Sequence, residues 1–354
     1  MKYCTIALLI VFTAICIGLF FLPDRIRTAN SVKSGQTIVA TTYPIWLFTR
    51  EIADGTGREV VLLTPADAGC PHDYALTPDD LRKISDQLLP VLLFKNGAGM
   101  DEHICKAAMA AHKGIEVIDT SAGIETVRNA EHDDHDHHDA EHDDDDEHDG
   151  EHEHHDGEAD HEHEHHDAEH EAEGHHHHHH HGGENGHFFA SPYEARKIVA
   201  TIAEALAKSD PANAAKYREN AANLDKQLQN LGDEFKTRLG PYAGNRVAAQ
   251  HSVFDYLLRD CGFETPFAIF ADAETSLSPA EITELTEEFQ EHGVKVIFTE
   301  PQYPDKLAKL IAQEMGAAVV KLDPVVSGPQ DPPMGYYIDT MKKNLELMEQ
   351  ALSK

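Results

Sequence analysis

The sequence predicts an α/β protein of two lobes, each built on a parallel sheet, with one long helix joining them. In both halves of the chain, short apolar runs alternate with stretches of helical periodicity. Such alternation is typical of βαβ units whose sheet is covered on both faces. Between the halves, apolar residues recur at spacings of three, four and seven from Tyr217 to Leu239, which indicates one continuous helical stripe.

The first half, residues 36–210, is expected to form the N-terminal lobe. Its short apolar runs predict strands at 37–41, 58–63, 90–94 and 115–119. Helical stretches at 45–53, 78–86, 100–112 and 192–207 separate or follow them.

The linking helix is predicted over residues 211–240. Asp210 and Pro211 form a start signal, with Asp as the cap and Pro at the first helical position. From Pro211 to Leu239 such a helix would run about 43 Å at 1.5 Å per residue, long enough to brace two domains.

Residues 241–354 are expected to form the C-terminal lobe. Strands are predicted at 247–250, 266–270, 294–300 and 317–322, and helices at 254–260, 279–291, 305–315 and 337–352. A capping box from Ser278 to Glu281, with Pro279 between them, marks one helix start.

The acidity of the chain belongs to one segment. The whole sequence has 63 acidic and 29 basic residues, yet residues 131–184 alone hold 24 acids and 21 histidines without a Lys or Arg. So polar a segment cannot bury enough apolar surface to order itself, and a disordered loop is predicted. His-rich tracts bind Zn²⁺, Cu²⁺ or Ni²⁺. The charge favours cations as partners and excludes nucleic acid.

The N-terminus predicts export from the cytoplasm. Lys2 precedes an apolar run at 5–22, and charge returns at Asp24. Residues 1–31 therefore read as a secretory signal or an N-terminal membrane anchor, and the sequence leaves both open. The expected location is periplasmic or otherwise extracytoplasmic.

Three cysteines lie beyond that segment, Cys70, Cys105 and Cys261. An odd number so widely spaced is no disulfide framework. One bridge with one free thiol stays open.

Three of the six histidines outside the insert lie in motifs that resemble those of a known family. His72 lies in TPADAGCPHDYALTPDD, His187 in NGHFFASP and His251 in QHSVFDYLLRDCGF. These resemble, in order, the three histidine-ligand motifs of the zinc-binding solute-binding proteins of ABC transporters, the ZnuA-like family. The second motif departs from the family pattern, because Phe189 replaces its Trp and Ser191 its second Asp. The stretch FTEPQYPDKLAKLIAQEMGAAVVKLDPVVSG resembles the family's C-terminal part, with Glu300 and Asp323.

The resemblance covers nearly the whole chain after Gly35, and it implies a metal site in the cleft between the two lobes. Its ligands would be His72, His187 and His251, with Asp323 or water in fourth place and Glu300 behind a ligand. Cys70, two residues before His72, is an alternative ligand, but the family uses no thiolate there. Three imidazoles with an oxygen ligand suit tetrahedral Zn²⁺, whereas Mn²⁺ favours more oxygens.

The function expected from the resemblance is capture of Zn²⁺ outside the cytoplasm by a monomer. The loaded protein would deliver the ion to a membrane permease driven by a separate ATPase. No enzyme activity is expected, because GxSxG and GxxxxGK[ST] are missing from the sequence. The alternative is a metal buffer or adhesin in which the His-rich loop carries the function.

Overall fold

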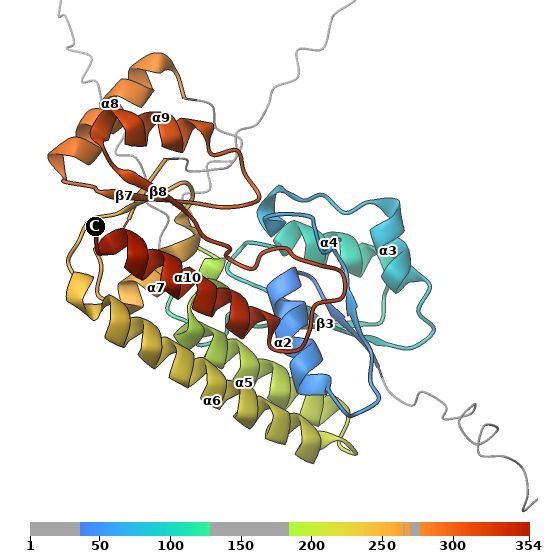
Figure 1. Cartoon of the computed structure of the whole chain (residues 1–354). Helices are drawn as coiled ribbons and strands as arrows, with labels where there is room; N and C mark the ends of the chain where they lie inside the picture. The colour runs from blue at the N-terminus through green and yellow to red at the C-terminus, as the bar shows by residue number, and fades with distance from the viewer. Residues whose placement is uncertain (1–35, 128–183, 265, 270–276) are drawn as a thin grey trace, which may run out of the picture.

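Two four-stranded parallel sheets form the centres of two lobes (Figure 1). The structure, a computed structural model, describes residues 36–127, 184–264, 266–269 and 277–354. The predicted signal or anchor at 1–31, and the His-rich loop at 131–184 except Glu184, lie outside these residues. In the part of the chain that is described, no helix has both the length and the apolarity to cross a membrane.

The two sheets share one strand order. The first is β2-β1-β3-β4 and the second β6-β5-β7-β8, and every pair of neighbours is parallel. The strands of the first sheet are β1 (Thr37–Ala40), β2 (Val60–Leu62), β3 (Val91–Lys95) and β4 (Ile115–Asp119). Those of the second are β5 (Ala248–Ala249), β6 (Phe267–Ala268), β7 (Val296–Thr299) and β8 (Ala318–Lys321). In both sheets the strand order reverses next to the strand that comes first in the chain, which is β1 in the first sheet and β5 in the second. In α/β sheets, ligands bind at such a switch point.

Each sheet has an outer face with its own apolar core. In the first lobe, Val39 and Leu93 pack with side chains of α3 (Pro78–Ser85) and α4 (Glu102–Ala111). In the second, Ile297 packs with residues of α8 (Pro279–Glu291) and α9 (Lys306–Met315). Neighbouring residues of a strand point to opposite faces of the sheet. The residues between those of the outer face therefore point to the inner face.

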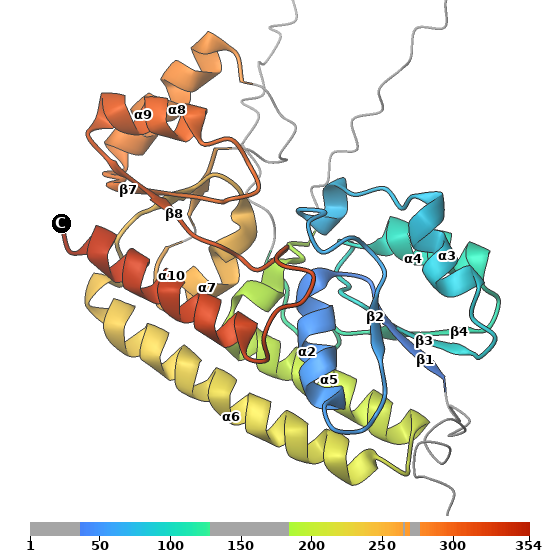
Figure 2. The ribbon, with the colours of Figure 1, turned by 45° about the vertical axis from the view of Figure 1, so that its right-hand side comes forward.

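The inner faces share one central core. Ile38 and Phe94 from the first sheet and Phe298 from the second lie in the same apolar cluster. Many of the other members come from five helices, α2 (Tyr43–Ala53), α5 (Pro192–Ser209), α6 (Ala214–Leu239), α7 (Asp255–Asp260) and α10 (Tyr336–Leu352). In Figures 1 and 2, α5, α6 and α10 run together along one side of both lobes.

The 26 residues of α6 make it about 39 Å long. Its predicted apolar stripe is buried, and the helix packs against α2 of the first lobe and α10 beside the second. Its start differs from the prediction. Residues 211–213 form a turn, and the Asp210 carboxylate accepts a hydrogen bond from the side chain of Asn213 instead of capping the helix.

Other local predictions match closely. The Ser278 hydroxyl accepts from the Glu281 backbone N–H, and the Glu281 carboxylate accepts from the Ser278 N–H, as a capping box requires. Cys70, Cys105 and Cys261 are all buried free thiols, so no disulfide joins them.

Candidate metal centre

The site forms where loops from both lobes meet at the carboxyl ends of the strands. His72 belongs to the short 3₁₀ helix η1 (Pro71–Asp73), which follows the loop after β2. His187 opens η2 (His187–Ala190), directly before α5. His251 comes two residues after β5 and caps η4 (Ser252–Phe254). Residues 72, 187 and 251 are thus brought together by the sheet topology.

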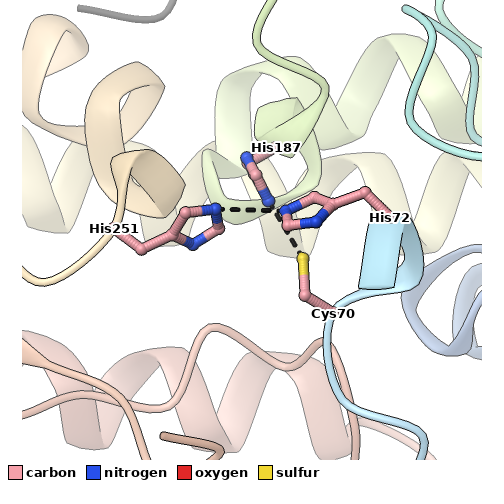
Figure 3. A group of neighbouring side chains, drawn as sticks. All are labelled: Cys70, His72, His187 and His251. Atoms are coloured by element: carbon pink, nitrogen blue, oxygen red, sulfur yellow. Dashed lines mark hydrogen bonds between the residues drawn. The ribbon is translucent and has the colours of Figure 1, made fainter. Parts of the chain in front are cut away.

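The three predicted histidines converge on one point (Figure 3). The Nε2 atoms of His72 and His251 are 3.2 Å apart. The ring centroid of His187 lies 5.5 Å from that of His72 and 4.5 Å from that of His251. Such close nitrogen atoms are normal for neighbours on one tetrahedral ion, because bonds of about 2.05 Å place them about 3.3 Å apart.

His187 is oriented by Asn185. The Asn185 Oδ1 atom is 2.9 Å from the backbone N of His187 and 2.8 Å from its Nδ1. A backbone N–H can only donate, so this Asn185 atom is the acceptor oxygen and Nδ1 of the ring must carry the proton. The lone pair of His187 is therefore on Nε2, facing the other two rings.

The other two imidazoles are backed by carboxylates. The Nδ1 of His72 is 2.7 Å from Oδ1 of Asp73, whose Oδ2 accepts a hydrogen bond of 2.8 Å from Tyr303 in the second lobe. The Nδ1 of His251 is 3.5 Å from Oε1 of Glu300, at the end of β7. The Asp73 oxygen on Nδ1 fixes the tautomer of His72 and raises the basicity of its Nε2, as behind metal-bound histidines, whereas Glu300 is a charged neighbour of His251 without a hydrogen bond to it.

Electrostatics keep the centre in its metal-binding form. Burial lowers the pKa of His187 well below its usual value, and repulsion from His251 and His72 adds to the effect. Burial alone would raise the pKa of Asp73, but hydrogen bonds from His72 and Tyr303 outweigh it and the pKa is lowered. Metal coordination needs a neutral imidazole, as at His187, and it is helped by an ionised carboxylate behind a ligand imidazole, as at Asp73 behind His72.

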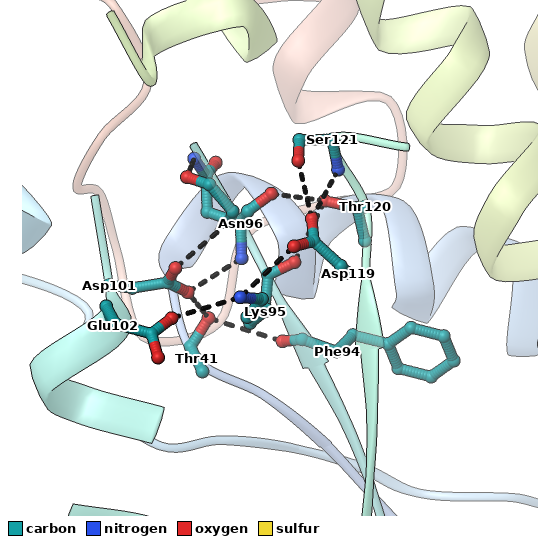
Figure 4. A network of polar contacts seen from close by, with 10 residues as sticks. Thr41, Phe94, Lys95, Asn96, Asp101, Glu102, Asp119, Thr120 and Ser121 are labelled. Atoms are coloured by element: carbon teal, nitrogen blue, oxygen red, sulfur yellow. Dashed lines mark hydrogen bonds and ion pairs between the residues drawn. The ribbon is translucent and has the colours of Figure 1, made fainter. Parts of the chain in front are cut away.

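Figure 4 shows a polar network around Asp101 and Asn96 at the end of β3, and this network supports the loop that carries His187. At the end of β3, Asp101 accepts hydrogen bonds from the Thr41 hydroxyl and the backbone N–H groups of Asn96 and Gly97. Asn96, fixed in this way, donates from Nδ2 to the carbonyl of Gly186, 2.9 Å away. The neighbour of His187 is therefore tied to the first sheet.

The structure adds one residue to the group and leaves two candidates outside it. Cys70 joins His72, His187 and His251 in a set whose ligand atoms all lie within 4.8 Å of one another. Asp323 is not a member of that set. Its Oδ1 accepts a hydrogen bond from the Val325 N–H, and its side chain lines a neighbouring cavity of about 400 Å³. Glu300 lies behind His251 and not among the converging atoms.

Sequence reasoning passed over Asn185 and Asp73. Asn185 is two residues from His187 and Asp73 is next to His72, so proximity in the chain was a usable signal. What the sequence does not contain is the direction of these side chains. Asn185 also donates to the Ser252 carbonyl, which couples His187 to the loop of His251.

Comparison with known proteins shows the family of the chain. The family described as ZnuA, zinc-uptake complex component A, periplasmic, matches residues 38–351. The high-affinity zinc uptake system protein ZnuA of Bacillus subtilis (strain 168) is 28% identical over 329 residues, which cover 92% of this chain and 90% of the relative. The zinc-binding protein AdcA of Streptococcus pyogenes serotype M3 is 27% identical over 342 residues, which cover 94% of this chain but 59% of AdcA.

Solved structures share the fold. The solute-binding protein FpvC from Pseudomonas aeruginosa, solved with Ni²⁺, has a TM-score of 0.68 at 26% identity, covering 90% of this chain and 97% of FpvC. A crystal structure of ZnuA has a TM-score of 0.65 at 21% identity, covering 90% of this chain and 100% of that one. The family is one of metal-binding transport components and not of enzymes. Because its model spans almost the whole chain, this protein belongs to the ZnuA family of periplasmic zinc-uptake components.

Proposed function

We propose that this protein captures Zn²⁺ outside the cytoplasm and delivers it to an ABC-type membrane permease with a cytoplasmic ATPase. The observation that carries the proposal is the convergence of His72, His187 and His251 with each Nδ1 next to an oxygen. That arrangement presents three neutral Nε2 atoms to one ion, which is the donor chemistry of zinc. The names of the relatives from Bacillus and Streptococcus support zinc as the cargo.

Zinc titration of the metal-stripped full chain tests the ligands. His72→Ala, His187→Ala and His251→Ala are each expected to lose the one tightest equivalent of Zn²⁺, measured by competition with a chelator. His292→Ala is the matched control, because this exposed side chain lies at the end of α8, where it contacts Arg246 and Phe267. Retention of the tight equivalent in all three ligand variants would reject the site.

Delivery is tested by growth. A strain that lacks this protein is expected to grow poorly in zinc-chelated medium, and the wild-type chain but not His187→Ala should restore growth. Equal rescue by both chains would contradict delivery through this site.

Deleting residues 131–183 separates transport from metal buffering. If the lobes carry the function, the shortened chain keeps one tight equivalent of Zn²⁺ and loses only weaker sites. Loss of all tight binding would assign the function to the His-rich segment, as in a buffer or adhesin.

A further inference from the structure

Cys70 reaches the point where the imidazoles meet. Its Sγ lies 3.2 Å from Nε2 of His187, and the side chain is 2% exposed (Figure 3). Gly69, at φ +81°, turns the chain just before it in a conformation that L side chains rarely adopt. Pro71 then opens the 3₁₀ helix that carries His72. The backbone therefore places residues 70 and 72 on the same side of the turn, facing His187 and His251.

The surroundings of Cys70 differ from those of the other two described cysteines. Cys105 packs in the apolar cluster of the first sheet, and Cys261 packs in the central apolar core. Cys70 instead contacts His187, and burial, together with the charges of Glu300 and Asp73, raises the pKa of its thiol well above the usual value. The His72 backbone N–H donates a hydrogen bond to its sulfur. A cysteine that only fills space is normally surrounded by apolar groups, and Cys70 is not.

The donor geometry fits a fourth ligand. With a Zn–S bond of about 2.3 Å and a Zn–N bond of about 2.05 Å, a tetrahedral ion holds S and N about 3.5 Å apart. The 3.2 Å between Cys70 Sγ and His187 Nε2 is within a few tenths of an ångström of that value. All four donor atoms lie within 4.8 Å of one another, so the side chains need to move only a little to surround an ion.

We propose that the Cys70 thiolate is the fourth ligand, so that the site is a three-histidine, one-cysteine centre selective for thiophilic cations. It would take Zn²⁺ and Cd²⁺ in preference to Mn²⁺, because thiolate is a soft ligand and manganese favours oxygen. Binding forms the metal–sulfur bond, and the thiol proton leaves to solvent. This inference rests on the proposed function, since it names the cargo class of the same site.

Charge balance supports the thiolate. A bound divalent ion brings two positive charges into a centre where His187, His251 and Glu300 are all buried. Asp73 and Glu300 lie behind His72 and His251, and the Cys70 thiolate would add a negative charge directly on the ion. Opposite charge at the ion offsets the cost of burying it.

Cobalt substitution tests the ligand directly. The reduced, metal-stripped full chain with one equivalent of Co²⁺ is expected to show the near-ultraviolet thiolate-to-cobalt charge-transfer band. Residues 131–183 contain no cysteine, so cobalt bound there cannot produce this band. The band should vanish in Cys70→Ser and persist in Cys105→Ser and Cys261→Ser, which control for the loss of a buried thiol.

Selectivity is measured by competition. Cys70→Ser is expected to lower the ratio of zinc affinity to manganese affinity by about tenfold or more. A wild-type chain that binds cobalt tightly without the band, or a Cys70→Ser variant that keeps the band and the ratio, would overturn the inference. Neither result touches the proposed function, which is tested by the histidine variants, the growth assay and the deletion of residues 131–183.

Discussion

At the scale of single residues, the site depends on what stands behind each imidazole. The amide of Asn185 lies behind His187. An exposed carboxylate, Asp73, lies behind His72, and a buried carboxylate, Glu300, lies behind His251. Glu300 is the most demanding of the three. It is 2% exposed, and among the described residues neither carboxylate oxygen receives a hydrogen bond, leaving only His251 at 3.5 Å. Buried carboxylates are normally satisfied, so these two unpaired oxygens fit a site that holds a cation.

Glu300→Gln should therefore weaken zinc binding by about 10- to 100-fold, the usual range for a residue that orients a ligand. The glutamine keeps the size of the side chain but removes the charge behind His251. Competition titration measures the change, with the exposed Glu314→Gln as control. Equal affinities for both variants would show that Glu300 contributes nothing to the site.

Asp255 gives a pH dependence of stability. Burial raises its pKa from 3.8 to about 7, against the opposing effects of His251 and an Asn185 hydrogen bond. The folded state therefore holds the proton more tightly than the unfolded state. The stability that this proton contributes is complete below pH 3.8 and is lost as the pH rises through 7.

Asp255→Asn should remove this dependence. At pH 8 the metal-free variant is expected to be more stable than the wild type by up to about 4 kcal/mol, from about three pKa units at 1.36 kcal/mol each. The advantage should shrink as the pH falls toward 5, as measured by urea unfolding of both chains. A constant difference across this pH range would contradict the assignment.

At the scale of elements, short loops and 3₁₀ helices place the ligands, and long helices support them. The loop before η2 is held between Asn96, whose Nδ2 donates to the Gly186 carbonyl, and Tyr256, whose hydroxyl donates to the Asn185 carbonyl. Gly186 has no room for a side chain. A Cβ there would lie 2.8 Å from Cβ of Met100.

Gly186→Ala is therefore expected to shift the loop and lower zinc affinity severalfold or more, although residue 186 is not itself a ligand. Gly240→Ala is the control, because a Cβ at Gly240 meets nothing within 4 Å. Titration of both variants makes the comparison. Unchanged affinity in Gly186→Ala would mean that the loop position is not critical.

At the scale of the whole molecule, the site joins the lobes. His72 and Cys70 come from the first lobe and His251 from the second, and Tyr303 reaches across to Asp73. The central apolar core and α6 already connect the same halves. A ligand that bridges both lobes binds only the folded state, so it must stabilise the fold.

Zinc at 100 times its dissociation constant should add about 2.7 kcal/mol to the free energy of unfolding. Thermal denaturation of the full chain, with and without zinc, measures this as an increase in the melting temperature. The increase should be absent in His187→Ala. An equal increase in that variant would place the stabilising ion elsewhere.

The sequence by itself determined the order and type of nearly every element, because strand and helix periodicities are local properties. It also determined three of the four converging side chains, since His72, His187 and His251 each lie in a motif. The start of α6 was misplaced because the Asp210 carboxylate could serve a turn as well as a helix cap. Whether this carboxylate caps the helix or stabilises the turn depends on the local backbone geometry, which the Asp-Pro pair does not specify.

Only the tertiary structure decided which fourth side chain meets the histidines. Cys70 and Asp323 were both available in the sequence, and residues 70 and 187 are 117 positions apart. The turn at Gly69 and the packing of two sheets on one core brought the thiol to the imidazoles and left Asp323 at the neighbouring cavity. Distances between segments so far apart in the chain arise from the packing of the whole fold, and no local pattern encodes them.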